Sequence, residues 1–214
     1  MIRPPRLSTL FPYTTLFRSI AATKIDMPNP LKPTGALLQG YLERWDSLEN
    51  YKLQEASLDL LFNKVCPLNT RIEEILLKVS TLNDFYSTNI FDTYSVARHI
   101  KELHIDRALH EDNYLVVNEV ANVKINGKTK NFYSFASKYF SHHKPETYPI
   151  FDSFVEKMLL HYRKADRFDE FEKSDLRQYE KFVQVMLKFR EHYNLSEFTL
   201  KEIDVFLWLA GKEW

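Results

Sequence analysis

Apolar residues recur along this chain at intervals of three and four, which is the pattern of a helix that buries one side. The stripes lie at residues 37–45, 58–65, 72–79, 96–103, 115–120, 176–189 and 203–209. Alternation of apolar and polar residues is confined to one short segment, residues 123–130. The pattern therefore predicts an all-α protein with at most one small β-hairpin.

Polar residues mark the starts of three predicted helices. Thr70 with Glu73, and again Thr199 with Glu202, have the spacing of a capping box, in which hydroxyl and carboxylate satisfy backbone amides at a helix start. Asp152 stands just before another amphipathic stretch, where an N-cap residue is expected. Gly211 is expected to end the last helix.

The alternating segment reads VKINGKTK over residues 123–130. Its centre, Asn126-Gly127, is favoured in the two-residue turns of β-hairpins. The sequence leaves open whether this segment is a β-ribbon or a local variant of a helical hairpin. Both interpretations expose Lys128 and Lys130.

Positive charge accumulates around this hairpin. Residues 124–145, which we call the basic segment, contain no carboxylate and five lysines: Lys124, Lys128, Lys130, Lys138 and Lys144. Such a cluster favours contact with a polyanion, although most lysines are ordinary solvated surface residues.

A helix is predicted over residues 132–143, inside the basic segment. Its apolar stripe contains Phe132, Phe135, Ala136, Tyr139, Phe140 and His143, and its other side contains Ser134, Ser137, Lys138 and Ser141. We expect the apolar side to pack and the polar side to be free to contact phosphate.

The stretch from Ser134 to Val155 resembles the core of the helix-hairpin-helix DNA glycosylases. In that family a helix that starts [KS]-T-A follows a DNA-gripping hairpin, and a P-[IV]-x-D-x-x-V run supplies the catalytic aspartate. Here Ser134-Phe135-Ala136 corresponds to the first motif and PIFDSFV, from Pro149 to Val155, to the second, at the family's spacing.

This resemblance implies a two-lobed helical domain whose partner is DNA, most simply a duplex. It implies an N-glycosylase that hydrolyses a damaged or modified base, with Asp152 as the catalytic carboxylate. The same aspartate also has a purely structural interpretation as an N-cap, and one residue can serve both roles.

Two features depart from the family pattern. The family's hairpin reads L-P-G-x-G, whereas the corresponding positions here carry Lys130 and Phe132, and the nearest glycine is Gly127. Ser134 stands where lyase-competent members carry a nucleophilic lysine. The resemblance therefore implies a monofunctional enzyme that removes the base without Schiff-base chemistry and leaves the backbone intact.

The resemblance also suggests DNA-contacting residues. The backbone contacts are expected from Lys128, Lys130, Ser134 and Lys138. Asn83 occupies a place like that of the family's wedge residue, with a turn-forming Asn-Asp pair as the alternative. Tyr133 is a candidate for stacking on an extruded base, with core packing as the alternative.

The first residues change the charge balance. Residues 8–19, STLFPYTTLFRS, look like the translation of a sequencing adapter, so residues 1–19 are expected to lie outside the fold and residues 20–214 to form a single helical domain. Without the three arginines of residues 1–19, 26 basic and 29 acidic residues remain, a formal charge of −3. Binding of nucleic acid would therefore depend on local clusters.

Composition excludes several classes. With Cys66 as the only cysteine, the chain cannot form an internal disulfide, a structural zinc finger or a cysteine-ligated iron–sulfur cluster. Its four glycines are dispersed, which excludes a P-loop and a Rossmann fingerprint. We expect no metal and no cofactor. No apolar run approaches about 18 residues, so we expect a cytoplasmic protein without a membrane partner.

Two other functions stay open from the sequence. One is a non-enzymatic helical module that binds nucleic acid on the same scaffold, which the altered hairpin favours. The other is a helical protein-interaction domain that binds no nucleic acid.

Overall fold

The computed structural model describes residues 30–214 of the chain. Residues 1–29, which hold the segment predicted to derive from an adapter, lie outside the described residues. Residues Lys32–Glu213 form one compact unit. Its fold is all-α with one two-stranded sheet, as the sequence pattern predicts.

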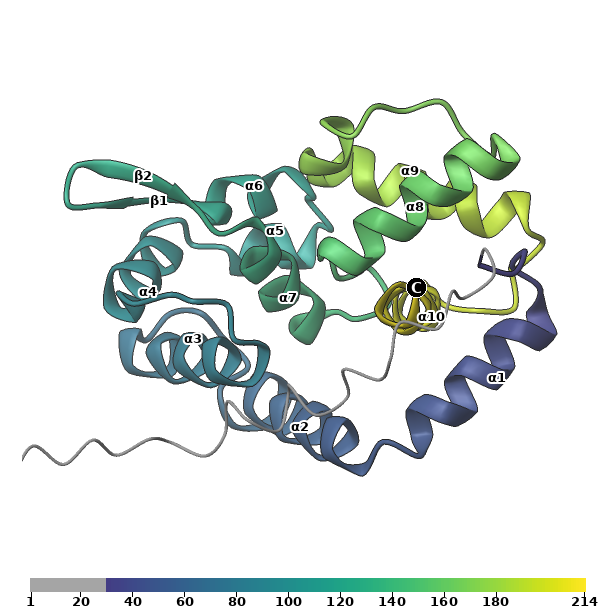
Figure 1. Cartoon of the computed structure of the whole chain (residues 1–214). Helices are drawn as coiled ribbons and strands as arrows, with labels where there is room; N and C mark the ends of the chain where they lie inside the picture. Colours follow the sequence, from purple (N-terminus) through teal and green to yellow (C-terminus); the bar gives the residue numbers. More distant parts are fainter. Residues whose placement is uncertain (1–29) are drawn as a thin grey trace, which may run out of the picture. The chain divides into compact units, whose positions relative to one another are not determined.

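The described elements, in chain order, are shown in Figure 1. The helices are α1 (Gly35–Asp46), α2 (Glu49–Asp59), α3 (Ile72–Tyr86), α4 (Thr93–Glu102), α5 (Asp106–His110), α6 (Leu115–Ala121), α7 (Tyr133–His143), α8 (Ser153–Asp166), α9 (Tyr179–His192) and α10 (Leu200–Glu213). A π-helix, η2 (Leu60–Val65), a 3₁₀ helix, η3 (Asp175–Arg177), and the strands β1 (Asn122–Ile125) and β2 (Lys128–Asn131) complete the set. No described helix is long and apolar enough to cross a membrane.

The two predicted capping boxes have different outcomes. At α10, Thr199 Oγ1 accepts a hydrogen bond from the backbone N–H of Glu202 at 3.2 Å, and Glu202 Oε2 accepts one from the N–H of Thr199 at 2.7 Å. This confirms the second box. At α3 the prediction is wrong, because Arg71 takes the extended N-cap conformation and no side chain caps the helix. Thr70 therefore lies one residue too early.

Gly211 lies inside α10 and does not end it. There α10 approaches the start of α8 so closely that a Cβ on residue 211 would lie 2.7 Å from the carbonyl oxygen of Phe154. The missing side chain is needed for this close approach of two backbones. The contact fixes the first turn of α8, which follows Asp152.

The alternating segment is a β-hairpin, which settles the choice that the sequence left open. Val123 pairs with Lys130 and Ile125 with Lys128 in an antiparallel register. Both turn residues have positive φ, 50° at Asn126 and 74° at Gly127, as a tight two-residue turn requires. The hairpin extends away from the helices (Figure 1).

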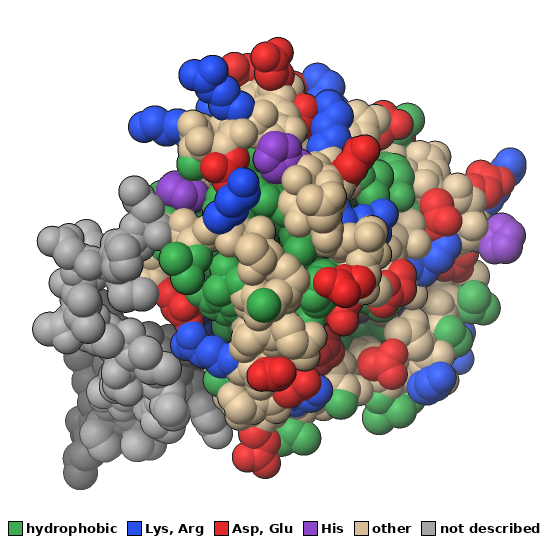
Figure 2. All heavy atoms as spheres, turned by 90° about the vertical axis from the view of Figure 1, so that its right-hand side faces the viewer, with side chains coloured by type: hydrophobic (Ala, Val, Ile, Leu, Met, Phe, Trp, Pro, Cys, Tyr) green, Lys and Arg blue, Asp and Glu red, His purple; other side chains and the backbone are tan. Residues whose placement is uncertain are grey.

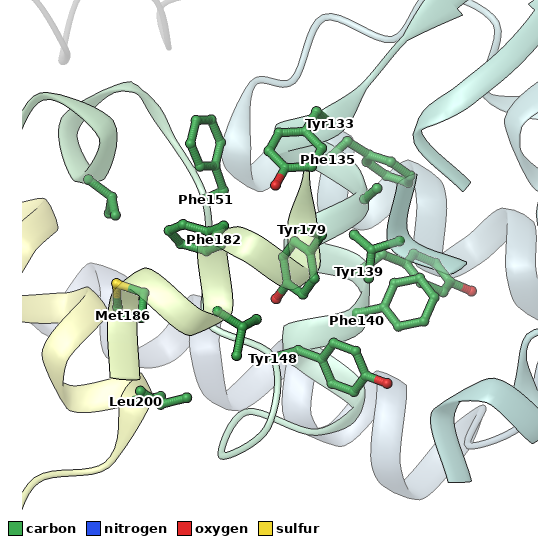
Figure 3. Packing of buried hydrophobic residues seen from close by; sticks show 14 of the residues in the cluster. Tyr133, Phe135, Tyr139, Phe140, Tyr148, Phe151, Tyr179, Phe182, Met186 and Leu200 are labelled. Atoms are coloured by element: carbon green, nitrogen blue, oxygen red, sulfur yellow. The ribbon is translucent and has the colours of Figure 1, made fainter. Parts of the chain in front are cut away.

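Aromatic side chains build much of the core between α7 and α9 (Figure 3). The rings of Tyr148 and Tyr179 are stacked, with centroids 6.1 Å apart. Phe151 packs edge-on against Phe182 at 5.3 Å. Aromatic pairs bury large apolar surfaces and prefer particular ring orientations. These pairs therefore fix the position of α9 against the segment that precedes α8.

The polar side of α7 is not on the surface, which corrects the sequence prediction. Ser137, Lys138 and Ser141 are all buried, with at most 5% of their surface exposed. The reason is that α7 is surrounded: α6 packs on it, and so do α2, η2 and α3. A sequence stripe shows which side is apolar, but not whether another helix covers the polar side.

On the face shown in Figure 2, acidic and basic side chains are interspersed around hydrophobic ones. The full chain has 29 basic and 29 acidic residues, and residues 20–214 have 26 and 29, so neither sign is in large excess. A surface that attracts a polyanion therefore has to come from a local group of cations.

Candidate functional site

Asp152 is the N-cap of α8. Its Oδ1 accepts hydrogen bonds from the backbone N–H groups of Phe154 at 2.9 Å and Val155 at 3.0 Å. The side chain is half-buried, and its Oδ2 has no hydrogen-bond partner among the residues that the structure describes. One carboxylate oxygen thus serves the helix, and the other is available for a ligand.

The segment before Asp152 is anchored to α7 and to α10. Ser137 Oγ, on α7, accepts a hydrogen bond from the backbone N–H of Phe151 at 3.0 Å. Asp204 Oδ2, on α10, accepts one from the N–H of Ile150 at 2.9 Å. These bonds satisfy buried backbone groups outside regular secondary structure. They also set the position of Asp152.

Lys138 is the buried cation of this region. Its Nζ donates to Ser134 Oγ at 2.6 Å and lies 5.2 Å from the centre of the Tyr86 ring. Long side chains on a helix lean toward its N-terminus, which is why the ammonium reaches Ser134 one turn earlier. Burial lowers the pKa of Lys138, and the carboxylates of Asp152 and Asp204 partly offset that shift.

Helix α10 brings two more charges to the same region. Lys201 Nζ lies 3.3 Å from Glu55 Oε1 and 4.0 Å from Asp204 Oδ1. Burial raises the pKa of Asp204 to about 6, an effect that Lys201 partly offsets. Burial disfavours the charge on Lys201, but Asp204, Tyr86 and Glu55 outweigh it and raise the pKa of Lys201.

A neutral pair completes the region. The hydroxyl of Tyr86 and Nε2 of His142 are 3.0 Å apart. Burial lowers the pKa of His142 to about 3, and the positive charges of Lys201 and Lys138 add to the effect. Burial also raises the pKa of the Tyr86 hydroxyl to about 12. Both side chains are therefore uncharged near neutral pH.

These side chains form one electrostatically connected group, which we call the Lys138 cluster. Its members are Tyr86, Ser134, Lys138, His142, Asp152, Lys201 and Asp204. They come from the end of α3, from α7, from the start of α8 and from α10. The tertiary structure thus places the predicted catalytic aspartate beside charges that lie far from it in the sequence.

The hairpin lysines form a separate feature. Lys124, Lys128 and Lys130 are exposed. Because residues opposite each other in an antiparallel pair share a face, Lys128 and Lys130 lie on the same face as Val123 and Ile125, and Lys124 lies on the other. The hairpin therefore displays cations on both faces.

The basic segment does not form one continuous surface. Three of its lysines are on the hairpin and Lys138 is buried. Lys144 forms an ion pair with Asp112 and also donates to the carbonyl oxygen of Leu109 at 3.1 Å. The prediction that Lys138 lies with Lys128 and Lys130 on a phosphate-contacting surface is therefore wrong.

Two other predicted contact residues have structural positions. Asn83 Oδ1 accepts from the N–H of Ile90 at 2.9 Å and from Thr88 Oγ1 at 2.7 Å, so its side chain closes the loop after α3. Tyr133 is 3% exposed and donates its hydroxyl proton to the carbonyl oxygen of Leu176 at 2.9 Å. The turn and core interpretations account for both, and we no longer assign either to nucleic acid.

Sequence reasoning missed Lys201, Asp204 and Glu55. Lys201 lies inside the predicted capping box, and Glu55 lies on a helix whose sequence indicates a solvent-exposed surface. Neither residue is therefore conspicuous in the sequence. A signal was present at Asp204, which interrupts the apolar stripe of α10 between Ile203 and Val205. A carboxylate on an otherwise apolar helix face indicates a buried partner.

A second buried polar group lies on the other side of α7, and we call it the Asn69 cluster. Asn69 Oδ1 accepts from Lys78 Nζ and from the Tyr139 hydroxyl, both at 2.6 Å. Asn69 Nδ2 donates to Asp106 Oδ1 at 2.6 Å and lies 3.3 Å from His143 Nε2. Every polar atom of the Asn69 side chain is thus used by the fold.

The fold and these clusters define a helical protein with a projecting basic hairpin. By sequence, the chain belongs to the HI_0787_N family, whose description reads "N-terminal domain" and whose match covers residues 37–147. Ser134 and Lys138 lie inside the matched range, whereas Asp152, Lys201 and Asp204 lie beyond it.

The chain is also similar to a protein of Haemophilus influenzae (strain ATCC 51907 / DSM 11121 / KW20 / Rd) that bears the name "Uncharacterized protein". The two are 44% identical over 146 residues, which cover 68% of this chain and 70% of the relative. No solved structure matches the chain.

Proposed function

We propose that this protein binds DNA and hydrolyses the N-glycosidic bond of a damaged or modified base, with Asp152 as the catalytic carboxylate. The observation that carries the proposal is the state of that side chain. Oδ1 is held by two backbone N–H groups, whereas Oδ2 is not used by the described fold. An aspartate that served only as a cap would need no further charges around it.

The chemistry calls for an anion at this point. Cleavage of an N-glycosidic bond develops positive charge on the sugar, and a nearby carboxylate stabilises that charge or orients the attacking water. The backbone bonds hold Asp152 in one orientation, which is what a preorganised catalytic group requires. The charge of Asp152 in turn favours the protonated form of the nearby Lys138.

The identity of residue 134 distinguishes simple hydrolysis from lyase chemistry. At the position of the lyase nucleophile of the resembling family, this chain has a hydroxyl that accepts a hydrogen bond from Lys138. We therefore propose hydrolysis that leaves the DNA backbone intact. Borohydride treatment of the protein with a duplex that contains an abasic site should give no covalent adduct.

The hairpin supplies the proposed contact with the DNA backbone. It connects α6 to α7, and these two helices pack against each other. Lys124, Lys128 and Lys130 carry three positive charges on this projection, without an ion-pair partner among the described residues. Cations of this kind bind phosphate without reading the base sequence.

A second candidate function is nucleic-acid binding without catalysis. The observation that favours it is the hairpin itself, which is a β-ribbon where the resembling family has a glycine-containing loop. A β-ribbon carries lysines to phosphate but does not bring backbone amides close to it in the same way. The two functions share the hairpin and differ in Asp152.

The decisive experiment measures base release from a panel of lesion-containing duplexes. We expect Asp152→Asn to reduce the rate by about 10²–10⁴-fold, the usual contribution of a positioned acid or base. Asp92→Asn is the matched control, because Asp92 is also an N-cap whose Oδ1 accepts a backbone hydrogen bond, at 3.0 Å from Ser95 N. It should leave the rate unchanged.

The possible results separate the candidates. Equal rates for wild type and Asp152→Asn would exclude the catalytic role of Asp152. Salt-dependent duplex binding with no base release from any duplex would leave binding without catalysis. No binding at low salt would overturn both.

A further inference from the structure

A depression on the surface of α4 is not used by the proposed reaction. It has a volume of about 380 Å³ and is lined by Ile72, Tyr94, Arg98, Lys101, Glu102 and His104. We call it the α4 pocket. Its size falls within the range of small-molecule sites, about 300–1,000 Å³.

The pocket combines an apolar surface with cations. Ile72 is half-buried at the start of α3, and Tyr94 is 56% exposed, so its ring is accessible. Tyr94, Arg98 and Lys101 are spaced i, i+4, i+7 and therefore share one side of α4. An aromatic ring next to positive charge suits a ligand with a flat ring and an anionic group.

The basic side chains of the pocket are not equivalent. Arg98 forms an ion pair with Glu102, with 3.1 Å between Nη2 and Oε1. Lys101 and His104 are exposed and form no ion pair with any described residue. These two side chains are therefore the ones available to an anion, and Glu102 is already neutralised by its own helix.

The pocket lies on a helix that borders the hairpin. α4 packs against β1, and His99 Nε2 lies 2.9 Å from the carbonyl oxygen of Glu119, just before β1 (Figure 1). An accessible aromatic ring on a helix that also carries cations and packs against a basic hairpin can hold an unpaired strand, by stacking on a base and by contact with its phosphates.

We propose that the α4 pocket binds one unpaired nucleotide of a nucleic-acid strand that the hairpin holds. The base lies against Tyr94 and Ile72, and a phosphate is bound by Lys101 and His104. This proposal rests on the proposed nucleic-acid binding, but not on the chemistry at Asp152. It adds a strand-binding site with its own recognition chemistry.

The test uses the whole protein in two titrations. In one, fluorescence anisotropy follows a labelled single-stranded oligonucleotide; in the other, NMR or calorimetry follows a 5′-nucleoside monophosphate. We expect Tyr94→Ala to weaken oligonucleotide binding by about 10-fold or more, because base stacking is lost. Tyr94→Phe should restore it, and Lys101→Ala should weaken binding and reduce its salt dependence.

Two matched controls exist on neighbouring helices. Leu115, on α6, is 59% exposed, close to the value for Tyr94. Arg107, on α5, is exposed and pairs with Glu111 in an i, i+4 ion pair, as Arg98 pairs with Glu102. Leu115→Ala and Arg107→Ala should bind as the wild type does. Equal binding by Tyr94→Ala and wild type overturns the proposal.

The two titrations test the α4 pocket independently of the base-release assay. If Tyr94→Ala weakens binding while Asp152→Asn does not, the α4 pocket stands even when no lesion duplex is cleaved. If bases are released but neither titration shows binding at the pocket, the pocket proposal fails alone. Tighter binding of the mononucleotide than of the oligonucleotide would assign the pocket to a free nucleotide and overturn its role in holding a strand.

Discussion

Lys78 and Lys138 are both buried lysines beside aromatic rings, yet their surroundings differ. Lys78 Nζ donates to the carbonyl oxygen of Leu68 at 3.0 Å and to Asn69 Oδ1 at 2.6 Å, and lies 3.2 Å from His143 Nε2. Lys138 Nζ has one hydrogen-bond partner among the described residues, Ser134 Oγ. One ammonium is enclosed by the fold, and the other is only partly satisfied.

The two pKa shifts follow the same contrast. Burial lowers the pKa of Lys78 to about 8, with Asp106 as the main opposing charge. Burial also lowers the pKa of Lys138, but its opposing charges are Asp152 and Asp204, which do not touch it. The Asn69 cluster is therefore a closed structural unit. The Lys138 cluster holds charges near a carboxylate oxygen that the fold leaves unused, which is why we place the function there.

The largest expected effect on stability is at Asn69. Asn69→Ala removes the acceptor shared by Lys78 and Tyr139 and leaves a buried ammonium with fewer partners. We expect a loss of about 3–5 kcal/mol in the free energy of unfolding, measured by urea denaturation. Asn50→Ala, at an exposed asparagine on α2, should change it by less than about 0.5 kcal/mol. Similar effects for the two variants would contradict the structural role of the Asn69 cluster.

The second prediction concerns the pH dependence of stability, and it involves one histidine from each cluster. His142, with a pKa lowered to about 3, and His143, whose pKa burial also lowers, take up protons less readily when folded. The unfolded chain therefore binds more protons below about pH 6.5, and stability falls as the pH falls through that value. We expect a loss of about 1 kcal/mol for each histidine between pH 6.5 and 5.5. Asp204, whose pKa is raised to about 6, takes up a proton in the folded protein over the same range and offsets part of this loss.

Urea denaturation at pH 7.5, 6.5 and 5.5 measures this slope. His142→Gln should make it shallower, because a neutral amide does not take up a proton. His110→Gln, at an exposed histidine on α5, is the control and should keep the wild-type slope. A wild-type stability that is constant over this range would show that the imidazoles are not buried as described.

The smallest effect is expected at Lys138. Lys138→Met keeps a long side chain next to Tyr86 and removes a desolvated charge whose one hydrogen-bond partner, Ser134, is only half-buried. We expect the free energy of unfolding to stay within about 1 kcal/mol of wild type or to rise. A loss as large as that of Asn69→Ala would mean that Lys138, like Lys78, is held for stability, and the contrast between the clusters would fail.

Local features were predictable where a short sequence sets the conformation. Asn126-Gly127 accepts positive φ at both turn residues, so the hairpin could be placed from the sequence. Asp152 and Thr199 could be placed as caps because a cap depends on the next three residues alone. Thr70 shows the limit, since the chain begins α3 one residue later than the pattern indicates.

The polar residues of the interior were not predictable in this way. Lys138 looked like a surface lysine because its own helix leaves it on the polar side. Whether that side is covered depends on α2, α3 and α10, and the sequence of α7 alone does not show where those helices lie. Lys201 and Asp204 were overlooked for the same reason, since the partners that give them meaning lie on other segments.

By itself, the sequence determined an all-α chain with one β-hairpin, the position of Asp152 at the start of a helix and the lysines of the hairpin. Only the tertiary structure decided that Lys138 is interior, that Lys138 and Asp204 lie within electrostatic reach of Asp152, and that Asn83 and Tyr133 serve the fold. Helix and turn preferences act between neighbouring residues, whereas the burial of a charge depends on residues that meet only once the chain is folded.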